Sequence, residues 1–285
     1  MSDKIYSMVY DRVAELIEKE GVLPWQRPWQ GVGVEPANFV NKKAYRGINP
    51  FMLSLAGYGC PFWVSYKQAK KLGGQVKKGS KSMPVIFWKW LDKKVKLPDG
   101  TEETDRFPML RYYNVFNLEQ CEGIEWSIGE KKDIPPIEHC EKIVSEMPKK
   151  PKIEHGKTGA WYSPTQDSVG IPDRGYFLDS EKYYSTLFHE LTHSTGHDSR
   201  LGRHKKNKCN HRFGSKDYSK EELVAEFGAA FLCAKTGIEN RTIDNSAAYL
   251  KSWVSKLEKN KKWLVQAAAQ AQKSTDFILG KKYND

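Results

Sequence analysis

The chain has 285 residues, 39% of them hydrophobic and 28% charged, which is enough for one large globular domain or two ordinary ones. Its net charge of +11 favours polyanionic partners such as nucleic acid, with a solvated lysine-rich surface as the alternative. It contains no apolar run long enough to span a membrane, so we expect no membrane partner.

The cysteines indicate a reducing compartment. There are five, scattered through the chain and never in a C-x-x-C pair. An odd, scattered set argues against a disulfide framework and against a cysteine zinc site. The N-terminus opens an amphipathic stretch in place of an apolar signal core, so we expect a cytoplasmic protein.

The first part of the chain mixes helical and strand patterns. Residues 5–20 carry apolar side chains near every 3.6 positions and predict a helix that Gly21 ends, followed by an extended proline loop at 23–29. Short helices are expected at 51–57 and 63–73, and strands at 84–90 and 111–116. We therefore predict an N-terminal α+β domain over residues 1–126.

The composition changes after this domain. Residues 127–157 are rich in lysine, glutamate and proline and predict a linker with one short helix near 138–147. Beyond it we expect a strand pair at 160–163 and 176–178, a basic loop at 200–216, and helices over 220–236 and 246–274. Residues 158–285 should form a mainly helical domain with a small sheet, so the whole chain is predicted to be α+β.

A helix in this second domain carries the pattern H-E-x-x-H, formed by His189, Glu190 and His193. Histidines four apart on one helix can hold a zinc ion while the glutamate beside them handles a proton. Capping residues precede the helix at 179–181, and an apolar stripe at 184, 187, 188 and 191 lies opposite the motif. A buried helix would aim all three side chains into one cavity; the alternative is two surface histidines on a solvated helix.

A catalytic zinc ion needs a third protein ligand and one open position. His197 continues the spacing, but Gly196 should end the helix before it, so we expect a supporting, capping or substrate role for His197. Glu222 and Glu226 lie one above the other on the next predicted helix, where like charges repel unless a cation is near. By analogy with glutamate-type zincins, Glu222 would bind the metal and Glu226 would support it. The reverse assignment stays open, as does a capping box in which Ser219 is the N-cap and explains Glu222.

The chemistry that this set implies is metal-assisted hydrolysis. Zinc lowers the pKa of a bound water to about 7, and Glu190 would accept its proton as the hydroxide attacks a carbonyl carbon. We predict one Zn²⁺ per chain, with Mn²⁺ or another divalent metal as the alternative. Tyr162, Tyr218 and His197 are candidates to stabilise the oxyanion.

The positive charge gathers in the N-terminal half. Residues 37–97 hold thirteen lysines and arginines, a single acid and ten aromatic rings. Cationic surfaces with exposed rings bind single-stranded nucleic acid, because phosphates meet the cations and bases stack on the rings. The alternative is that most of the rings are core; we expect two to four to be accessible. The candidate phosphate contacts are Lys67, Lys70, Lys71, Lys77, Lys78 and Lys81, and the candidate stacking residues are Tyr45, Arg46, Trp63 and Tyr66.

Together these motifs resemble the ArdC-like antirestriction proteins of plasmids, phages and conjugative elements. The N-terminal matches are at 21–25, 28–29, 36–38, 45–49, 67–70, 73–79 and 113–117, with Trp63 and Gln120. The C-terminal matches are at 162–164, 167, 189–193, 196–197, 200–201, 221–226 and from 249 onward. The basic loop at 203–212 is more cationic than the family pattern leads us to expect, which suits either a further DNA contact or a solvated surface.

The resemblance implies a single-stranded-DNA-binding domain joined to a zincin-like metallopeptidase domain. It further implies protection of DNA that enters a cell as a single strand, during conjugation for example, with a host restriction enzyme or another protein as the target. Two other interpretations remain: a DNA-coating protein whose zinc is structural, and a primase-accessory or nuclease-like protein. An intact Glu190 favours the enzyme, because a structural zinc site has no need of a general base.

Overall fold

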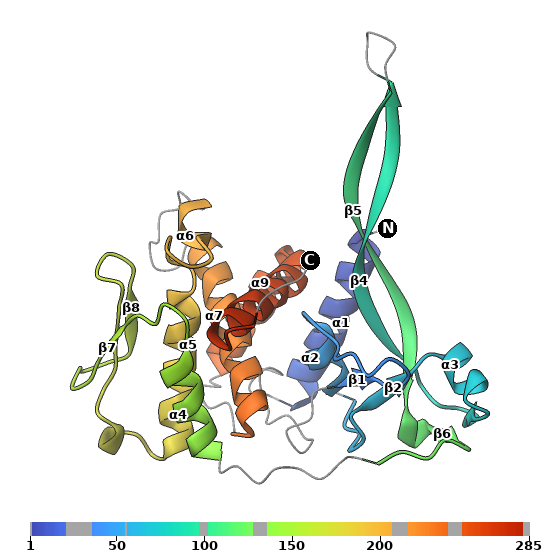
Figure 1. Cartoon of the computed structure of the whole chain (residues 1–285), viewed down its shortest axis with the longest axis horizontal. Coiled ribbons are helices and arrows are strands. Elements are labelled where there is room, and N and C mark those ends of the chain that lie inside the picture. The colour runs from blue at the N-terminus through green and yellow to red at the C-terminus, as the bar shows by residue number, and fades with distance from the viewer. Residues whose placement is uncertain are drawn as a thin grey trace.

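The computed structural model describes residues 2–20, 36–54, 56–96, 102–127, 136–206, 216–238 and 247–281. The predicted loop at 23–29 and Cys209 lie outside the described residues, as does most of the basic loop at 200–216. The mixed α+β architecture is confirmed (Figure 1). Cys60, Cys121, Cys140 and Cys233 are buried free thiols, as expected. No helix in the described ranges is long and apolar enough to cross a membrane.

The N-terminal half is built on a four-stranded sheet in the order β1-β2-β5-β4. Its strands are β1 (Ala37–Asn38), β2 (Phe62–Val64), β4 (Met83–Lys96) and β5 (Glu102–Asn117). β1 runs parallel to β2, and the other neighbours are antiparallel. β4 and β5 are longer than predicted and form a twisted two-stranded ribbon that extends from the body (Figure 1). A second small sheet pairs β3 (Gln75–Val76) with β6 (Cys121–Glu122), and the 3-10 turn η2 (Leu118–Gln120) precedes β6.

The helices of this half are α1 (Ser2–Glu20), α2 (Asn49–Ser54) and α3 (Tyr66–Lys71). α1 confirms the prediction from the 3.6-residue pattern. The predicted helix at 63–73 is shorter in the structure because Trp63 and Val64 belong to β2. Ser65 then caps α3 in a reciprocal pair of hydrogen bonds with Gln68.

The C-terminal half packs helices against a three-stranded sheet in the order β7-β9-β8. Its strands are β7 (Lys152–Glu154), β8 (Trp161–Ser163) and β9 (Ser168–Gly170), and its 3-10 turn is η3 (Arg174–Tyr176). The helices are α4 (Pro136–Glu146), α5 (Ser180–Ser194), α6 (Arg203–Lys206), α7 (Lys216–Thr236), α8 (Ala247–Lys259) and α9 (Lys262–Ile278).

The predicted strand at 176–178 is wrong. Tyr176 lies in η3, where its N–H donates to the carbonyl of Asp173 and so offers nothing to a neighbouring strand. Leu178 is 93% exposed. The partner of β8 is β9, whose three residues are all buried. Gly170 in β9 is needed because a Cβ there would collide with the indole of Trp161.

From α4 onward the predicted linker at 127–157 packs into the C-terminal core, while residues 128–135 lie outside the described residues. Cys140, Ile143, Val144 and Met147 are buried in the same core as α5, and β7 pairs with β9 through Lys152 and Ser168. The sequence pattern was polar because α4 and β7 expose one side each. Residues of α4 and β7, which precede the predicted boundary at 158, therefore pack with the C-terminal elements.

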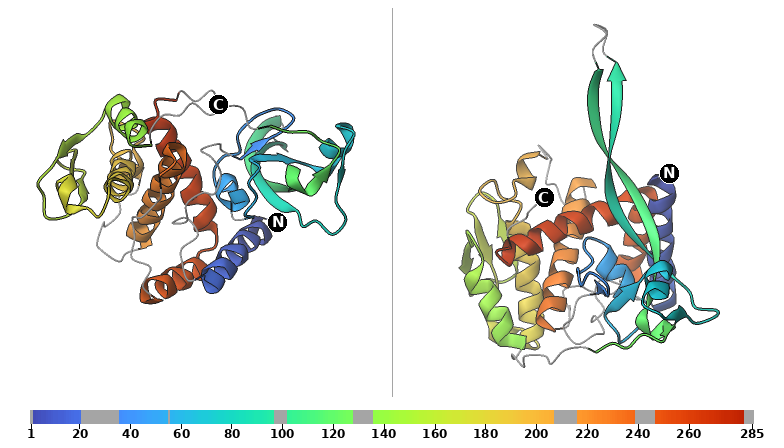
Figure 2. Two further views of the ribbon diagram at one scale, coloured as in Figure 1. Left: turned by 90° about the horizontal axis from the view of Figure 1, so that it is seen from below. Right: turned by 45° about the vertical axis from the view of Figure 1, so that its right-hand side comes forward.

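The two halves share a hydrophobic core. Ile5, Val9 and Val13 of α1 pack in one cluster with Phe227 of α7 and with α8 and α9 residues such as Leu264. The views in Figure 2 show α1 beside α8 and α9. Because this cluster holds residues from both ends of the chain, each half buries part of its apolar surface against the other.

Candidate metal centre and nucleic-acid interface

Helix α5 presents the H-E-x-x-H motif as the sequence predicts. Asp179 caps it, accepting a hydrogen bond of 2.8 Å from the backbone N–H of Lys182. The predicted apolar stripe is buried to 2% exposure or less, at Tyr184, Leu187, Phe188 and Leu191. The opposite side of the helix therefore directs the motif into a cavity of about 360 Å³, lined among others by His189, Glu190 and His193.

Helix α7 crosses α5 closely enough to bring its carboxylates to the histidines. At the crossing, a Cβ on Gly228 would collide with the side chain of Thr192, so the close approach requires glycine. α7 begins at Lys216, which places Ser219 inside the helix. The capping-box explanation of Glu222 is therefore wrong.

The side chains of His189, His193 and Glu222 meet where α7 crosses α5. Each offers one donor atom, and the three donor atoms lie within 4.8 Å of one another. The two Nε2 atoms are 3.2 Å apart. Glu222 Oε2 lies 3.6 Å from His189 Nε2, and its Oε1 lies 3.6 Å from His193 Nε2. Tetrahedral zinc with bonds of about 2.0–2.1 Å separates its ligand atoms by roughly 3.3 Å, and His₂Glu is a donor set of catalytic zinc sites. The residues therefore fit one divalent ion.

Glu226, the alternative third ligand, lies one turn further along α7. It is 2% exposed and is not part of the three-donor group. Burial alone would lower the pKa of His189. The contact with Glu222 and the charges of Glu190 and Glu226 outweigh burial and raise this pKa to about 9. Glu226 thus acts on His189 through its charge.

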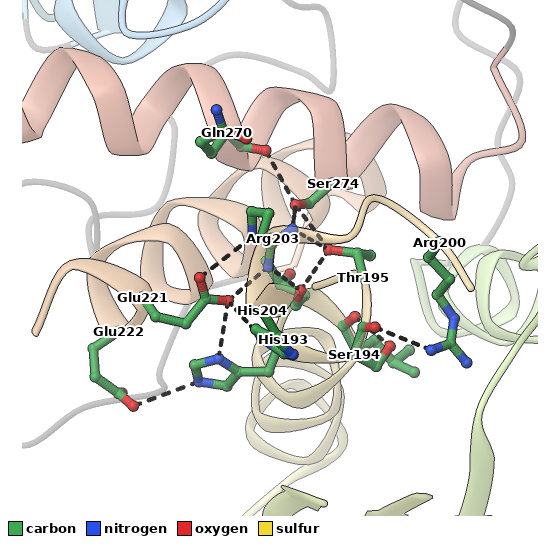
Figure 3. Close-up of polar contacts among 12 residues, drawn as sticks. His193, Ser194, Thr195, Arg200, Arg203, His204, Glu221, Glu222, Gln270 and Ser274 are labelled. Carbon is green, nitrogen blue, oxygen red and sulfur yellow. Dashed lines mark hydrogen bonds and ion pairs between the residues drawn. The ribbon is translucent and has the colours of Figure 1, made fainter. Parts of the chain in front are cut away.

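Glu221 supports the second histidine, and sequence reasoning assigned it no role. Its Oε1 lies 3.6 Å from Nδ1 of His193, while Arg203 donates to Oε1 at 2.6 Å and to Oε2 at 3.3 Å (Figure 3). Burial would raise the pKa of Glu221, but the Arg203 charge and the neighbouring histidines hold it well below its usual range. A carboxylate behind a ligand histidine fixes the orientation of the ring.

Arg203 itself joins three helices. It is buried and donates to Thr195 Oγ1 at 2.7 Å, to Ser274 Oγ at 2.8 Å and to the carbonyl of Thr192 at 3.0 Å (Figure 3). Arg203 thus ties the end of α5, through Glu221 the start of α7, and through Ser274 the helix α9. No spacing rule could find it, because its partners are 8, 11, 18 and 71 positions away.

His204, the next residue, lines the metal cavity and was also missed. Its Nε2 lies 3.6 Å from Glu221 Oε1, and its ring lies against Gly196, where a Cβ would collide with it. Gly196 was expected only to end a helix. In the structure α5 ends at Ser194, and Gly196 makes room for the His204 ring.

The remaining candidates separate clearly. His197 stands outside the three-donor group; its Nδ1 is 2.8 Å from Ser199 Oγ, and its carbonyl accepts from the backbone N–H groups of Arg200 and Gly202 in the turn after α5. Tyr162 lines the metal cavity and donates its hydroxyl to Asp167 at 2.9 Å. The side chain of the third oxyanion candidate, Tyr218, lies outside the described residues.

On the N-terminal half, the predicted phosphate contacts Lys67, Lys70, Lys71, Lys77, Lys78 and Lys81 are all exposed. Tyr66 is 53% exposed, so its ring is accessible and its stacking role stays a prediction. Trp63 is 2% exposed in a core cluster with Leu53 and Met83, so its prediction as a stacking residue is wrong. The pattern could not distinguish it, because β2 is a central strand whose rings face the core.

Four of the ten aromatic rings between 37 and 97 are exposed, which confirms the expected two to four. Besides Tyr66 they are Phe87, Trp88 and Trp90 on β4, which sequence reasoning did not single out. The two other predicted stacking residues, Tyr45 and Arg46, line a separate cavity of about 420 Å³. Burial raises the pKa of Tyr45, whose hydroxyl accepts from Asn38 Nδ2 at 3.5 Å.

The fold and the metal centre define a zincin-like metallopeptidase domain, and the family model of that description matches residues 138–270. A second model, the N-terminal domain of the anti-restriction factor ArdC, matches residues 3–116. The metal-free crystal structure of the antirestriction ArdC protein from plasmid R388 superposes with a TM-score of 0.76 at 34% identity, covering 98% of this chain and 99% of that one. Its Mn(II)-bound structure superposes with a TM-score of 0.72, covering 96% and 97%. The chain belongs to the ArdC-like antirestriction family.

Two curated relatives are longer than this chain. Two proteins of Escherichia coli named DNA primase TraC are 36% and 35% identical over 95% and 96% of this chain, but the chain spans only 27% and 20% of their lengths. The y4eC protein of Sinorhizobium fredii is 31% identical over 96% of this chain and 91% of its own length. The zincin-like domain implies a divalent metal.

Proposed function

We propose that this protein binds single-stranded DNA and protects it from host restriction, and that its C-terminal domain is a zinc-dependent peptidase. In this proposal His189, His193 and Glu222 hold the ion. Glu226 acts on His189 through its charge, and Glu221 orients the ring of His193. The observation that carries the peptidase part of the proposal is the set of separations of 3.2–3.6 Å among the three donors, with Glu190 in the same cavity.

When bound, zinc would supply a Lewis acid and acidify a water. The carboxylate of Glu190 would take the proton of that water and pass it to the leaving amine. Glu190 is 8% exposed, so little bulk water competes for it. Tyr162 is the best-placed oxyanion candidate because it lines the same cavity. Its hydroxyl would have to turn from Asp167 to the substrate to serve.

The N-terminal half supports the DNA-binding part of the proposal. Six exposed lysines lie on and after α3, and Nζ of Lys70 lies 6.0 Å from the centroid of the exposed Tyr66 ring. Each phosphate contact with a single strand contributes about −0.7 to the slope of log affinity against log salt. Affinity for oligothymidine should therefore fall steeply with salt, and a flat dependence would remove the electrostatic argument.

A second function is a DNA-coating protein, or a conjugation or primase accessory factor, whose zinc is structural. The resemblance to part of the proteins named DNA primase TraC favours this alternative. Two observations favour the peptidase. The donor group found among the described residues has three members, whereas a structural zinc ion is normally closed by four protein ligands. The buried Glu190 also lies beside this group, where it could act as the general base.

The metal and the hydrolysis can be tested separately. Calorimetric zinc titration of His189→Ala and Glu222→Ala should show loss of high-affinity binding, whereas Glu226→Gln should bind with 10- to 100-fold lower affinity. If Glu226→Gln lost high-affinity zinc binding and Glu222→Ala retained it, Glu226 would be the third ligand in place of Glu222. Glu190→Gln should bind zinc as the parent does and cleave no member of a mixed peptide library. Cleavage at the parent rate would refute the general-base role.

The biological role can be tested by transferring DNA as a single strand into cells that carry a restriction enzyme. The comparison uses the parent, Glu190→Ala, and a triple variant that changes Lys67, Lys70 and Lys71 to glutamate. A matched triple variant at the exposed Lys251, Lys259 and Lys262 controls for charge. The proposal expects the α3 variant and Glu190→Ala to lose protection. Full protection by Glu190→Ala would favour the DNA-coating alternative.

A further inference from the structure

The cavity of about 420 Å³ lies at the junction of the two halves. One wall is the 38–49 segment with Tyr45 and Arg46, a second is formed by β4 and β5, and a third is formed by Gln272 and Lys273 of α9. The walls are fastened together: Arg46 forms an ion pair with the buried Asp276, and the N–H of Gly47 donates to Gln272 Oε1 at 3.3 Å. Its volume is that of a small-molecule site.

Apolar rings from both faces of the β4–β5 ribbon are available on the strand side of this cavity. Phe87, Trp88 and Tyr113 line it and are between 41% and 46% exposed. Phe87 and Tyr113 pack edge to face with ring centroids 5.7 Å apart, which holds them in fixed orientations. Large rings left partly open at one concave place mark a binding surface more often than a solvated one.

The charged side chains that line the cavity are cations, and one of them, Arg46, is paired with Asp276. Lys43, Arg46 and Lys273 line it, and its lining within the described residues contains no aspartate or glutamate. The side-chain amides of Asn41 and Gln272 add hydrogen-bonding groups. The ligand that matches rings, amides and cations together carries a flat heteroaromatic part and a negative charge.

We propose that this cavity takes an unpaired base of single-stranded DNA, with the flanking phosphates at Lys43 and Lys273. The inference rests on the proposed DNA-binding function and locates it in a site to which both halves contribute. The predicted cationic surface adjoins it, because Asn38 of the cavity wall exchanges two hydrogen bonds of 3.2 Å with Gln68 of α3. A strand could thus run from the lysines of α3 into the cavity.

The test compares two single-residue pairs in the full chain. Trp88→Ala removes a ring from the cavity, and Trp90→Ala removes a similarly exposed ring two positions along the same strand that stacks on Arg106 outside the cavity. Lys273→Glu reverses a charge at the cavity, and Lys262→Glu reverses an exposed charge elsewhere on α9. Binding is measured by fluorescence anisotropy with oligothymidine and with an oligonucleotide of equal length made of abasic residues. Thermal unfolding verifies that each variant is folded.

Stacking of one base on a ring corresponds to a change of about 5- to 150-fold in affinity. Trp88→Ala should therefore weaken oligothymidine binding by at least fivefold and leave abasic binding near the parent value. Lys273→Glu should weaken both, and the two control variants should bind both as the parent does. An oligonucleotide carrying iodouracil should crosslink to residues of the cavity.

The outcomes separate the two claims. Parent-like oligothymidine binding by both Trp88→Ala and Lys273→Glu, with crosslinks confined to α3, would overturn the cavity site and leave the DNA-binding function standing. Equal losses in Trp88→Ala and Trp90→Ala would also overturn it. A parent that binds no single-stranded DNA would overturn the DNA-binding function itself. Tight capture of an uncharged aromatic peptide, unaffected by Lys273→Glu, would show that the cavity serves a protein ligand.

Discussion

Replacing Arg203 with methionine should destabilise the protein strongly while keeping the volume of the side chain. The guanidinium is buried and donates two hydrogen bonds to Glu221, which is itself largely buried. Without the arginine, the neighbours of the Glu221 carboxylate that could carry a positive charge are His193 and His204, each 3.6 Å from Oε1. Removing one partner of a buried pair costs about 3–5 kcal/mol, because the other charge stays desolvated.

The other contacts of Arg203 add little to this cost. The Thr195 hydroxyl still donates to the carbonyl of Thr192 at 2.6 Å, and the Ser274 hydroxyl still donates to the carbonyl of Gln270 at 3.1 Å. We therefore expect a loss of about 3–5 kcal/mol, a large share of the total for a domain stable by about 5–15 kcal/mol.

The measurement is urea unfolding at neutral pH in the presence of a chelator, so that metal affinity does not enter the free energy. Adding Glu221→Gln to Arg203→Met removes the stranded charge, so the double variant should be more stable than the sum of the two single losses predicts, by about 0.5–3 kcal/mol. A loss below about 1 kcal/mol for Arg203→Met, or strictly additive effects, would refute the stranded-charge explanation.

Three further predictions follow from the same contacts. Gly228→Ala should lower the free energy of unfolding by about 1–3 kcal/mol and weaken zinc binding, because its Cβ would push α7 away from Thr192 of α5. Urea unfolding and calorimetry measure the two effects, and Gly175→Ala, whose Cβ would meet nothing within 4 Å, should be neutral in both. Burial alone would raise the pKa of Asp167, but the hydrogen bonds from Arg200 outweigh burial and lower this pKa. The Asp167–Arg200 pair therefore stabilises the fold fully above about pH 4 and less as the pH falls. The thermal stability of Asp167→Asn should approach that of the parent in acid, and a difference that stays constant with pH would contradict the linkage. Zinc at about 100 times its dissociation constant should raise unfolding free energy by about 2.7 kcal/mol, and a chelator should reverse the gain.

Local signals predicted which side chains meet at the candidate metal centre. The cap at Asp179, the apolar stripe of α5 and the spacing of His189 and His193 are properties of a single helix, and each depends on neighbours within a few residues. Glu222 could be proposed because an unexplained pair of like charges on one helix face is costly. The structure places Glu222, and not Glu226, in the three-donor group.

The residues that support the centre carry no such local signal. Glu221 and Glu222 are adjacent, about 100° apart around α7, yet both reach His193 because the helix crosses above the histidines. That crossing depends on Gly228 and Thr192, which pair two helices far apart in sequence. Periodicity indicates that a helix has an apolar face but not which helix it meets, and this is why the shared core of α1 with α8 and α9 was not predicted either.

Helix α9 connects the proposed base cavity with the proposed metal site. It carries Gln272 and Lys273 on the wall of the proposed base cavity and Asp276 paired with Arg46. It also carries Ser274, which accepts from Arg203 and so reaches Glu221 and the metal histidine. A base that draws Lys273 inward would act on the same helix turn that positions Arg203. If the two sites are coupled, thermodynamic reciprocity requires oligothymidine to change zinc affinity by the same factor by which zinc changes oligothymidine affinity. Calorimetric zinc titration with and without oligothymidine measures this factor in the parent. Lys273→Glu should bring it toward one, whereas Lys262→Glu on the same helix should leave it unchanged.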